Sequence, residues 1–226
     1  MGRAARLAIA FSVVALACSA VYASGWGRPT RPVRTPTPPG SRALLPPDDR
    51  PAPAGLQKAT FAGGCFWCME EAFDHLTGVV STTSGYTGGP LAHPAYDEVS
   101  VGGTGHVEAV EVLFDPRVVS YQDLLAHYWK NVDPFNDRGQ FCDYGEQYRP
   151  VIFAHGPDQR AEADASRRRV EGQLSRATVV DVVDGTAFYP AEAEHQNYHA
   201  VHPLRYLSYT WACGRKQRLR EVWTPQ

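Results

Sequence analysis

Two cysteines stand at the point where a glycine pair meets a run of residues with helical spacing. Cys65 and Cys68 follow the glycines at 63–64. Apolar residues then recur three or four apart, as on one face of a helix, at Phe66, Met69, Phe73 and Leu76. A helix that begins here places Cys65 in its first turn, where unpaired N–H groups and the positive end of the helix dipole favour a thiolate. With Phe66 and Trp67 beside it, Cys65 is predicted to be a redox-active nucleophile rather than a buried structural thiol.

The elements that must position this nucleophile are indicated by hydrophobic periodicity and by turn residues. Strands are expected at 58–61, 79–83, 106–114, 150–154 and 179–183, and helices at 66–77, 121–131, 157–174, 191–199 and 213–222. Segments 84–90, 94–105 and 133–149 are expected to be loops, and 204–209 is ambiguous. Strands that alternate with helices predict an α/β (α+β) fold, a two-layer sandwich with the site in loops at one end of the sheet.

The charge distribution separates the first part of the chain from the rest. Residues 1–57 contain seven Arg and two Asp, whereas residues 58–226 contain fifteen Lys or Arg and twenty-two Asp or Glu. An acidic folded part would repel phosphates, which excludes nucleic acid as a partner. The 43% hydrophobic content is enough for a packed core. We expect a single folded domain that is a monomer.

The N-terminal segment has the features of an export signal. Arg3 and Arg6 precede an apolar run over 7–17, and small residues follow it. This order predicts a signal peptide over residues 1–23 and an exported, periplasmic protein. Lipid attachment at Cys18 is the less favoured alternative, because Ala15 stands where lipoprotein signals prefer leucine.

Proline dominates the segment that follows. Nine of the chain's eighteen prolines lie within residues 24–57, where few residues are apolar. Such a segment cannot bury enough surface to offset its ordering entropy, so we predict a disordered linker over 24–57. The catalytic domain is then expected over 58–226.

Five short motifs occur along the folded part in a fixed order. They are Gly64-Cys65-Phe66-Trp67, Ser84-Gly85-Tyr86, Gly105-His106-Val107-Glu108, the run 143–149, and Tyr189-Pro190-Ala191-Glu192 with His195-Gln196 after it. This set resembles the A type of peptide methionine sulfoxide reductase over about residues 58–210. The resemblance implies a mixed sheet with a ferredoxin-like core, no cofactor and no metal. It also implies repair of methionine-S-sulfoxide in oxidised proteins and peptides, with free methionine sulfoxide also accepted.

The resemblance also implies roles for individual residues. Cys65 would attack the sulfoxide sulfur, and Glu108 would protonate the oxygen that must leave. The substrate-binding residues would be Phe66, Trp67, Tyr86, Asp143 and Tyr148. In these roles the aromatic pair receives the substrate's methyl group, the two phenols donate to its oxygen, and Asp143 holds the polar side. Without the resemblance, Glu108 reads as a solvent-facing strand residue, each tyrosine as a core residue and Asp143 as a loop cap.

Oxygen transfer would leave Cys65 as a sulfenic acid, which a second thiol must convert into a disulfide that an external dithiol reduces. Family precedent favours Cys213, near the C-terminus, as this resolving thiol. Geometry favours Cys68, which lies on the same helical side as Cys65. Cys142 neighbours Asp143, but its side chain is expected to point away. We place Cys213 slightly ahead of Cys68, and we expect a thioredoxin-type reductant.

Two other functions fit parts of the sequence. A thioredoxin-like thiol-disulfide oxidoreductase would use Cys65 and Cys68 alone, and a secreted binding module would use them as a stabilising disulfide. A metal site at the three histidines of 195–202 is disfavoured, because no acidic third ligand and no zincin pattern accompany them.

Overall fold

The structure is a computed structural model that describes residues 47–224. The predicted signal peptide and most of the predicted linker lie outside these residues. The described end of the linker, 47–56, contains no helix or strand. It is fastened to the domain, because the Asp48 N–H donates to the Phe188 carbonyl at 2.7 Å and its carboxylate lies 3.5 Å from Lys58 Nζ.

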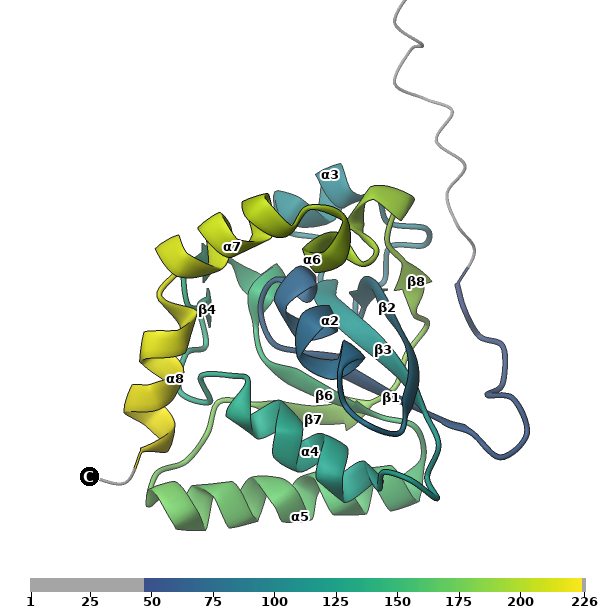
Figure 1. The fold of residues 1–226 in the computed structure, drawn as a ribbon. Helices are drawn as coiled ribbons and strands as arrows, with labels where there is room; N and C mark the ends of the chain where they lie inside the picture. The colour runs from purple at the N-terminus through teal and green to yellow at the C-terminus, as the bar shows by residue number, and fades with distance from the viewer. Residues whose placement is uncertain (1–46, 225–226) are drawn as a thin grey trace, which may run out of the picture. The chain divides into compact units, whose positions relative to one another are not determined.

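A six-stranded mixed sheet forms the centre of the domain (Figure 1). Its strands are β1 (Gln57–Ala62), β2 (Val79–Thr87), β3 (Val107–Phe114), β6 (Val151–Ala154), β7 (Asp181–Asp184) and β8 (Tyr189–Pro190). They lie in the order β7-β6-β1-β3-β2-β8, in which β6 and β7 pair in parallel and the other pairs are antiparallel. The unit β1-α2-β2-β3-α4-β6 has the β-α-β-β-α-β order of a ferredoxin-like core, which confirms the predicted fold class.

Helices α2 (Phe66–Asp74), α4 (Tyr121–Lys130) and α5 (Pro157–Leu174) share the main hydrophobic core with one face of the sheet. Ser120 begins α4 with a capping box, in which its hydroxyl accepts from the Asp123 N–H and the Asp123 carboxylate accepts from the Ser120 N–H. In the core, the ring of Phe61 stacks on Phe73 with centroids 5.0 Å apart and on Tyr128 at 5.2 Å.

Alternation along β3 decides where Glu108 lies. Val110, Val112 and Phe114 belong to the core beneath the helices, and Glu108 has the same parity. Glu111 has the opposite parity and pairs with Lys58 at 3.0 Å. Glu108 is therefore a residue of the helix-covered face, not a solvent-facing one.

Three expected loops contain regular structure. Strand β2 continues through Tyr86, because Gly85 and Tyr86 pair with Pro190 and Tyr189 of β8. Residues 94–105 contain helix α3 (Tyr96–Ser100). Residues 133–149 contain β4 (Gly139–Gln140), β5 (Asp143–Tyr144) and the 3₁₀ turn η1 (Glu146–Tyr148). These differences come from tertiary pairing, which local turn residues do not reveal.

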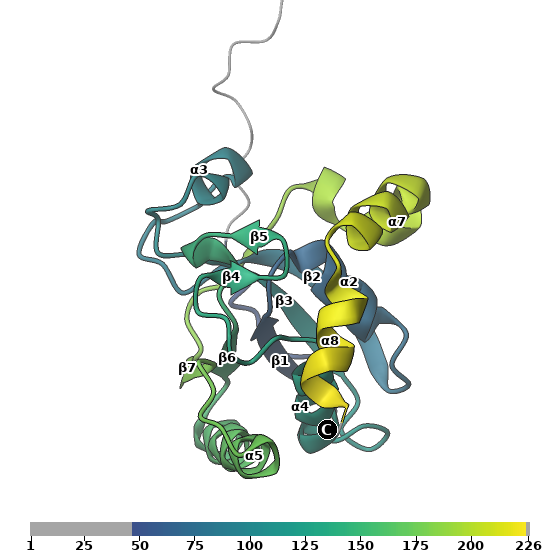
Figure 2. The same ribbon diagram turned by 90° about the vertical axis from the view of Figure 1, so that its left-hand side faces the viewer.

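The expected helix at 191–199 is broken. A 3₁₀ turn, η2 (Ala193–His195), is followed by Asn197 in the left-handed conformation and then by α6 (Tyr198–Val201). Helices α7 (Pro203–Ala212) and α8 (Arg215–Trp223) complete the chain. Figure 2 shows both beside the β4–β5 hairpin at one edge of the domain. Among residues 47–224, none of the helices has the length and apolar character needed to cross a membrane.

Candidate active site

The turn that presents Cys65 requires glycine at position 64. Gly64 has φ +90°, and a Cβ there would lie 2.6 Å from the Cβ of Gln140. Cys65 is the N-cap of α2, and its carbonyl accepts from the Cys68 N–H at 3.0 Å. The predicted position of Cys65 at a helix start is confirmed.

The predicted thiolate at Cys65 is contradicted. Only 7% of Cys65 is exposed, and this burial raises the pKa of its thiol. The Cys68 thiol and the carboxyls of Glu108 and Asp143 raise it further. In this site burial and acidic neighbours therefore outweigh the favourable helix end, and the resting group is a thiol.

Glu108 lies under the first turn of α2. It is 2% exposed, and its Oε2 accepts a hydrogen bond from the Phe66 backbone N–H at 3.0 Å. Burial raises the pKa of Glu108 to about 8, and Asp143 and Cys68 add to the rise, although the Phe66 N–H opposes it. The carboxyl is therefore protonated at neutral pH, which is the state that a general acid needs.

Asp143 connects the β4–β5 hairpin to Cys65. Its carboxylate accepts from the Cys65 backbone N–H, and its Oδ2 accepts from the Tyr209 hydroxyl at 2.5 Å. Burial raises the pKa of Asp143, whereas Tyr209, Arg215 and the Cys65 N–H oppose the rise. The Asp143 carboxyl thus lies next to the Cys65 backbone, on the polar side of the site that was expected of it.

Three tyrosines near the site divide into two groups. Burial raises the pKa of both Tyr148 and Tyr96, and both phenols interact electrostatically with Cys65, Glu108 and Asp143. Both hydroxyls therefore stay protonated and can donate. Tyr86 is fully buried instead, and its hydroxyl donates to Glu192 Oε2 at 2.9 Å. The described contact of the Tyr86 hydroxyl is thus structural, and Tyr96 is the second phenol beside the nucleophile.

Phe66 and Trp67 form an aromatic wall with residues of the C-terminal part. The Trp67 ring stacks on Tyr198 with centroids 3.7 Å apart and meets the edge of Tyr209 at 6.1 Å. Phe66 packs 5.4 Å from the His195 ring. These contacts fix the orientation of the indole, two residues after Cys65 in the chain.

Cys68 is a buried free thiol in the same turn as Cys65. A hydrogen bond from Cys65, the charge of Arg215 and a hydrogen bond from the Tyr206 hydroxyl lower the pKa of Cys68 to about 7, against the opposing effect of burial. At neutral pH, Cys68 is thus the more acidic thiol of the pair.

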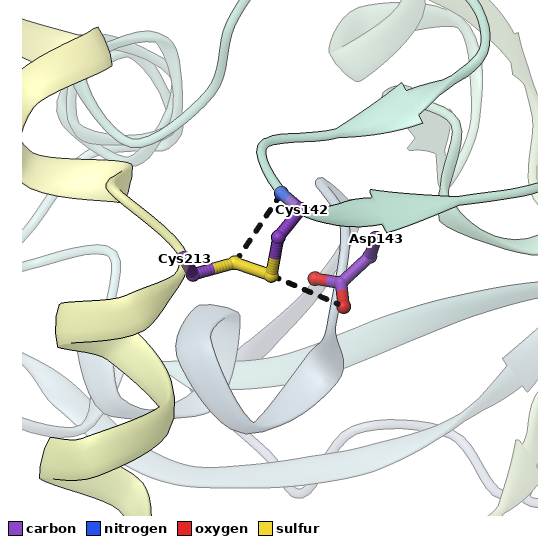
Figure 3. A group of neighbouring side chains, drawn as sticks. All are labelled: Cys142, Asp143 and Cys213. Atoms are coloured by element: carbon purple, nitrogen blue, oxygen red, sulfur yellow. Dashed lines mark hydrogen bonds between the residues drawn. A yellow bond between two sulfur atoms is a disulfide. The ribbon is translucent and has the colours of Figure 1, made fainter.

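Cys213 forms a disulfide with Cys142, with Cα atoms 4.9 Å apart (Figure 3). Cys142 lies in the turn between β4 and β5, and Cys213 lies between α7 and α8. Among residues 47–224, Cys142, Asp143 and Cys213 are also the one group of three potential metal ligands that lie close together. Since the two sulfurs are bonded to each other, they are not available as thiolate ligands.

A family model described as peptide methionine sulfoxide reductase matches residues 57–226. The chain belongs to this family. Peptide methionine sulfoxide reductase MsrA of Bacillus licheniformis is 46% identical over 167 residues, which cover 73% of this chain and 92% of that protein. MsrA of Listeria innocua is 44% identical over 170 residues, with 74% and 96% covered. As a peptide methionine sulfoxide reductase, the chain is an oxidoreductase.

Solved structures agree with this assignment. Methionine sulfoxide reductase A of Corynebacterium diphtheriae superposes with a TM-score of 0.65 at 30% identity, covering 73% of this chain and 87% of that one. Mxr1 of Saccharomyces cerevisiae in reduced form gives a TM-score of 0.65 at 26% identity, covering 71% and 93%. The ferredoxin-like core described above is thus the fold of this reductase family.

Four residues at this site are not among those predicted from the sequence. Tyr96 lies in a segment expected to be irregular, and Tyr206, Tyr209 and Arg215 lie in an ambiguous segment and in a charged helix. Tyr96 could have been noticed as a tyrosine in an expected loop, where no hydrophobic periodicity assigns it to the core. Tyr206 and Tyr209 could have been noticed because they are three residues apart, which places both on one face of a helix.

Proposed function

We propose that this reductase acts on the S epimer of methionine sulfoxide in proteins and peptides, with Cys65 as the oxygen acceptor. The observation that carries this proposal is the Glu108 carboxyl, protonated at neutral pH and hydrogen-bonded to the Phe66 N–H in the same turn as Cys65. A sulfoxide oxygen leaves only after it gains a proton, and this acid is poised to supply one.

The oxygen-transfer step uses the groups around Cys65. The aromatic wall of Phe66 and Trp67 receives the S-methyl group, while the phenols of Tyr96 and Tyr148 donate to the sulfoxide oxygen. Cys65 sulfur attacks the substrate sulfur as Glu108 protonates the oxygen. The net result converts the sulfoxide and the Cys65 thiol into a thioether and a Cys65 sulfenic acid, and the Cys65 proton restores Glu108.

For the second step, we infer that Cys68 is the resolving thiol and not Cys213, which family precedent places slightly ahead. Cys213 is bonded to Cys142, whereas Cys68 is free and accepts a hydrogen bond from Cys65. Cys68 would attack the sulfenic sulfur, which forms a Cys65–Cys68 disulfide and releases water. A thioredoxin-type dithiol would then reduce this disulfide and become oxidised itself.

The decisive assay compares two epimers and one unrelated substrate. Purified full-length protein is incubated with dithiothreitol and either the S or the R sulfoxide of a blocked methionine, and separately with insulin. We expect methionine from the S epimer alone. Insulin reduction without sulfoxide reduction would instead support the thioredoxin-like alternative, and reduction of both epimers would contradict the proposed selectivity for the S epimer.

Export is a separate proposal, and it is supported by the charge and hydropathy pattern of residues 1–23. Fractionation of cells that express the full chain would test it. We expect the protein outside the cytoplasm and shortened by about 23 residues. A protein that keeps residues 1–23 and stays in the cytoplasm would contradict it, and acylated Cys18 would favour the lipoprotein alternative.

A further inference from the structure

Helix α7 supplies two side chains to the thiol pair, yet little of its own surface holds it in place. Of its ten residues only Tyr206 is buried. Leu204 is 81% exposed and Trp211 is 87% exposed. Since burial of apolar surface is the main force that fixes a helix on a domain, α7 needs other attachments.

Those attachments converge at its C-terminal end. The Tyr209 hydroxyl donates to Asp143 Oδ2 at 2.5 Å. The disulfide of Cys213, at the junction of α7 and α8, ties that junction to Cys142 across 71 residues of sequence. Beyond it, the buried Arg215 donates to the Asn131 carbonyl. The disulfide is the one covalent link among these attachments, and Figure 3 shows it between the hairpin and the helix junction.

The same disulfide adjoins the carboxyl that contacts Cys65. The Cys142 sulfur lies 3.8 Å from Asp143 Oδ1, while the Asp143 carboxylate accepts from the Cys65 N–H. From the opposite side of the disulfide, Tyr206 and Arg215 face Cys68. Movement at the Cys142–Cys213 junction would therefore reach Cys65 through Asp143, and Cys68 through Tyr206 and Arg215.

We propose that the Cys142–Cys213 disulfide is a clamp that positions Tyr206, Tyr209 and Arg215 against the Cys65–Cys68 pair. Closure of the Cys65–Cys68 disulfide then depends on the clamp being oxidised. Reduction of the clamp to two thiols by an external dithiol, which supplies two electrons and two protons and becomes a disulfide itself, therefore slows the resolving step. This rests on the proposed role of Cys68. Cys142 and Cys213 are positioning residues here: they accept no oxygen, and they pass no electrons to Cys65.

The test compares the full-length wild type with a Cys142→Ser/Cys213→Ser double variant in a single turnover with one equivalent of S sulfoxide. Rapid alkylation and peptide mapping give the rate of Cys65–Cys68 disulfide formation at several pH values. Hydrogen exchange reports on residues 203–212. In the double variant we expect the Cys65–Cys68 disulfide to form about tenfold more slowly than in the wild type. We also expect the midpoint of the plot of this rate against pH to lie at a higher pH than in the wild type. We also expect faster exchange in α7, with methionine still formed.

Controls separate the clamp from other roles. Because one bond is removed either way, each single Cys→Ser variant should slow closure as much as the double variant does. Trp211→Ala, on the exposed side of α7, should leave closure unchanged. If the double variant does not fold, Tyr206→Phe provides the second test: it should raise the pH midpoint without faster exchange in α7.

Three results would overturn the clamp. One is closure in the double variant at the wild-type rate and midpoint. Another is a double variant that forms the Cys65–Cys68 disulfide at the wild-type rate and loses turnover only when a protein dithiol replaces dithiothreitol. Cys142 and Cys213 would then be an electron relay. The third is a Tyr206→Phe variant with an unshifted midpoint. Absence of methionine from the wild type would instead refute the proposed function, so the two failures are distinguishable.

Discussion

Glu108 Oε2 and the Phe66 backbone N–H are joined by a 3.0 Å hydrogen bond that links strand β3 to the first turn of α2. Such a donor favours the carboxylate, yet the pKa of Glu108 is raised to about 8, because burial has the larger effect. The bond therefore positions an acid without ionising it. Two predictions depend on this relationship.

The first concerns activity. Glu108→Gln keeps the acceptor for the Phe66 N–H but cannot donate a proton, so we expect kcat to fall about 100-fold or more. In the wild type, activity should decline as pH rises through about 8, where Glu108 loses its proton. The variant should lack that decline. Steady-state rates from pH 6 to 10 check this.

Glu111→Gln is the matched control, because it removes a carboxyl from the same strand on the opposite face of the sheet. A decline near pH 8 that persists in Glu108→Gln, or that disappears in Glu111→Gln, would contradict the assignment.

The second prediction concerns stability. The folded-state pKa of Glu108 lies above its ordinary unfolded value, so its contribution is fully present below about pH 4.5 and is lost as pH rises through about 8. Between about pH 4.5 and pH 8, the unfolding free energy of Glu108→Gln should therefore rise relative to that of the wild type, by at most about 1.4 kcal/mol per pH unit. Urea unfolding at pH 5 and pH 8 measures the difference. An equal difference at both pH values would be inconsistent with the raised pKa.

A third prediction separates two tyrosines. Tyr96→Phe removes a hydrogen-bond donor beside Cys65 and Glu108. We expect kcat to fall by up to about tenfold, with KM little changed. Tyr86→Phe removes a hydrogen bond to Glu192 and should mainly lower the unfolding free energy, by about 1 kcal/mol. Steady-state kinetics and urea unfolding of both variants measure these two effects. A larger loss of kcat in Tyr86→Phe would return the second donor role to Tyr86.

The fourth prediction concerns the resolving thiol. Cys65→Ser should form no methionine, because the oxygen acceptor is gone. Cys68→Ser should form one equivalent per enzyme and then stop, with a sulfenic acid trapped at Cys65. Cys213→Ser should continue to turn over with dithiothreitol, although more slowly. Quenched single-turnover assays without dithiothreitol, read with a sulfenic-acid probe, check the first two variants, and steady-state rates with dithiothreitol check Cys213→Ser. A disulfide at Cys65 in Cys68→Ser, in place of the trapped sulfenic acid, would favour Cys213 as the resolver.

The local features of this protein follow from its sequence. The glycine pair before Cys65, the serine cap at Ser120 and the alternation along 107–114 each depend on residues a few positions apart. Each of these elements begins within one residue of its expected start, although α2 ends at Asp74, before the expected position 77. The ordered motifs indicated the family for the same reason, because each motif consists of a few neighbouring residues in the sequence. The resemblance to that family also implied that Glu108 is the proton donor.

The remaining features were decided by contacts between distant parts of the chain. The pKa of Cys65 rises because elements far away in sequence bury it, which no helix-start rule includes. Tyr86 turned to Glu192, 106 residues away, and Tyr96 occupies the place near Cys65 that was expected of Tyr86. Cys142 and Cys213 paired across 71 residues. Burial and long-range pairing are sums over the whole fold, so only the tertiary structure could determine them.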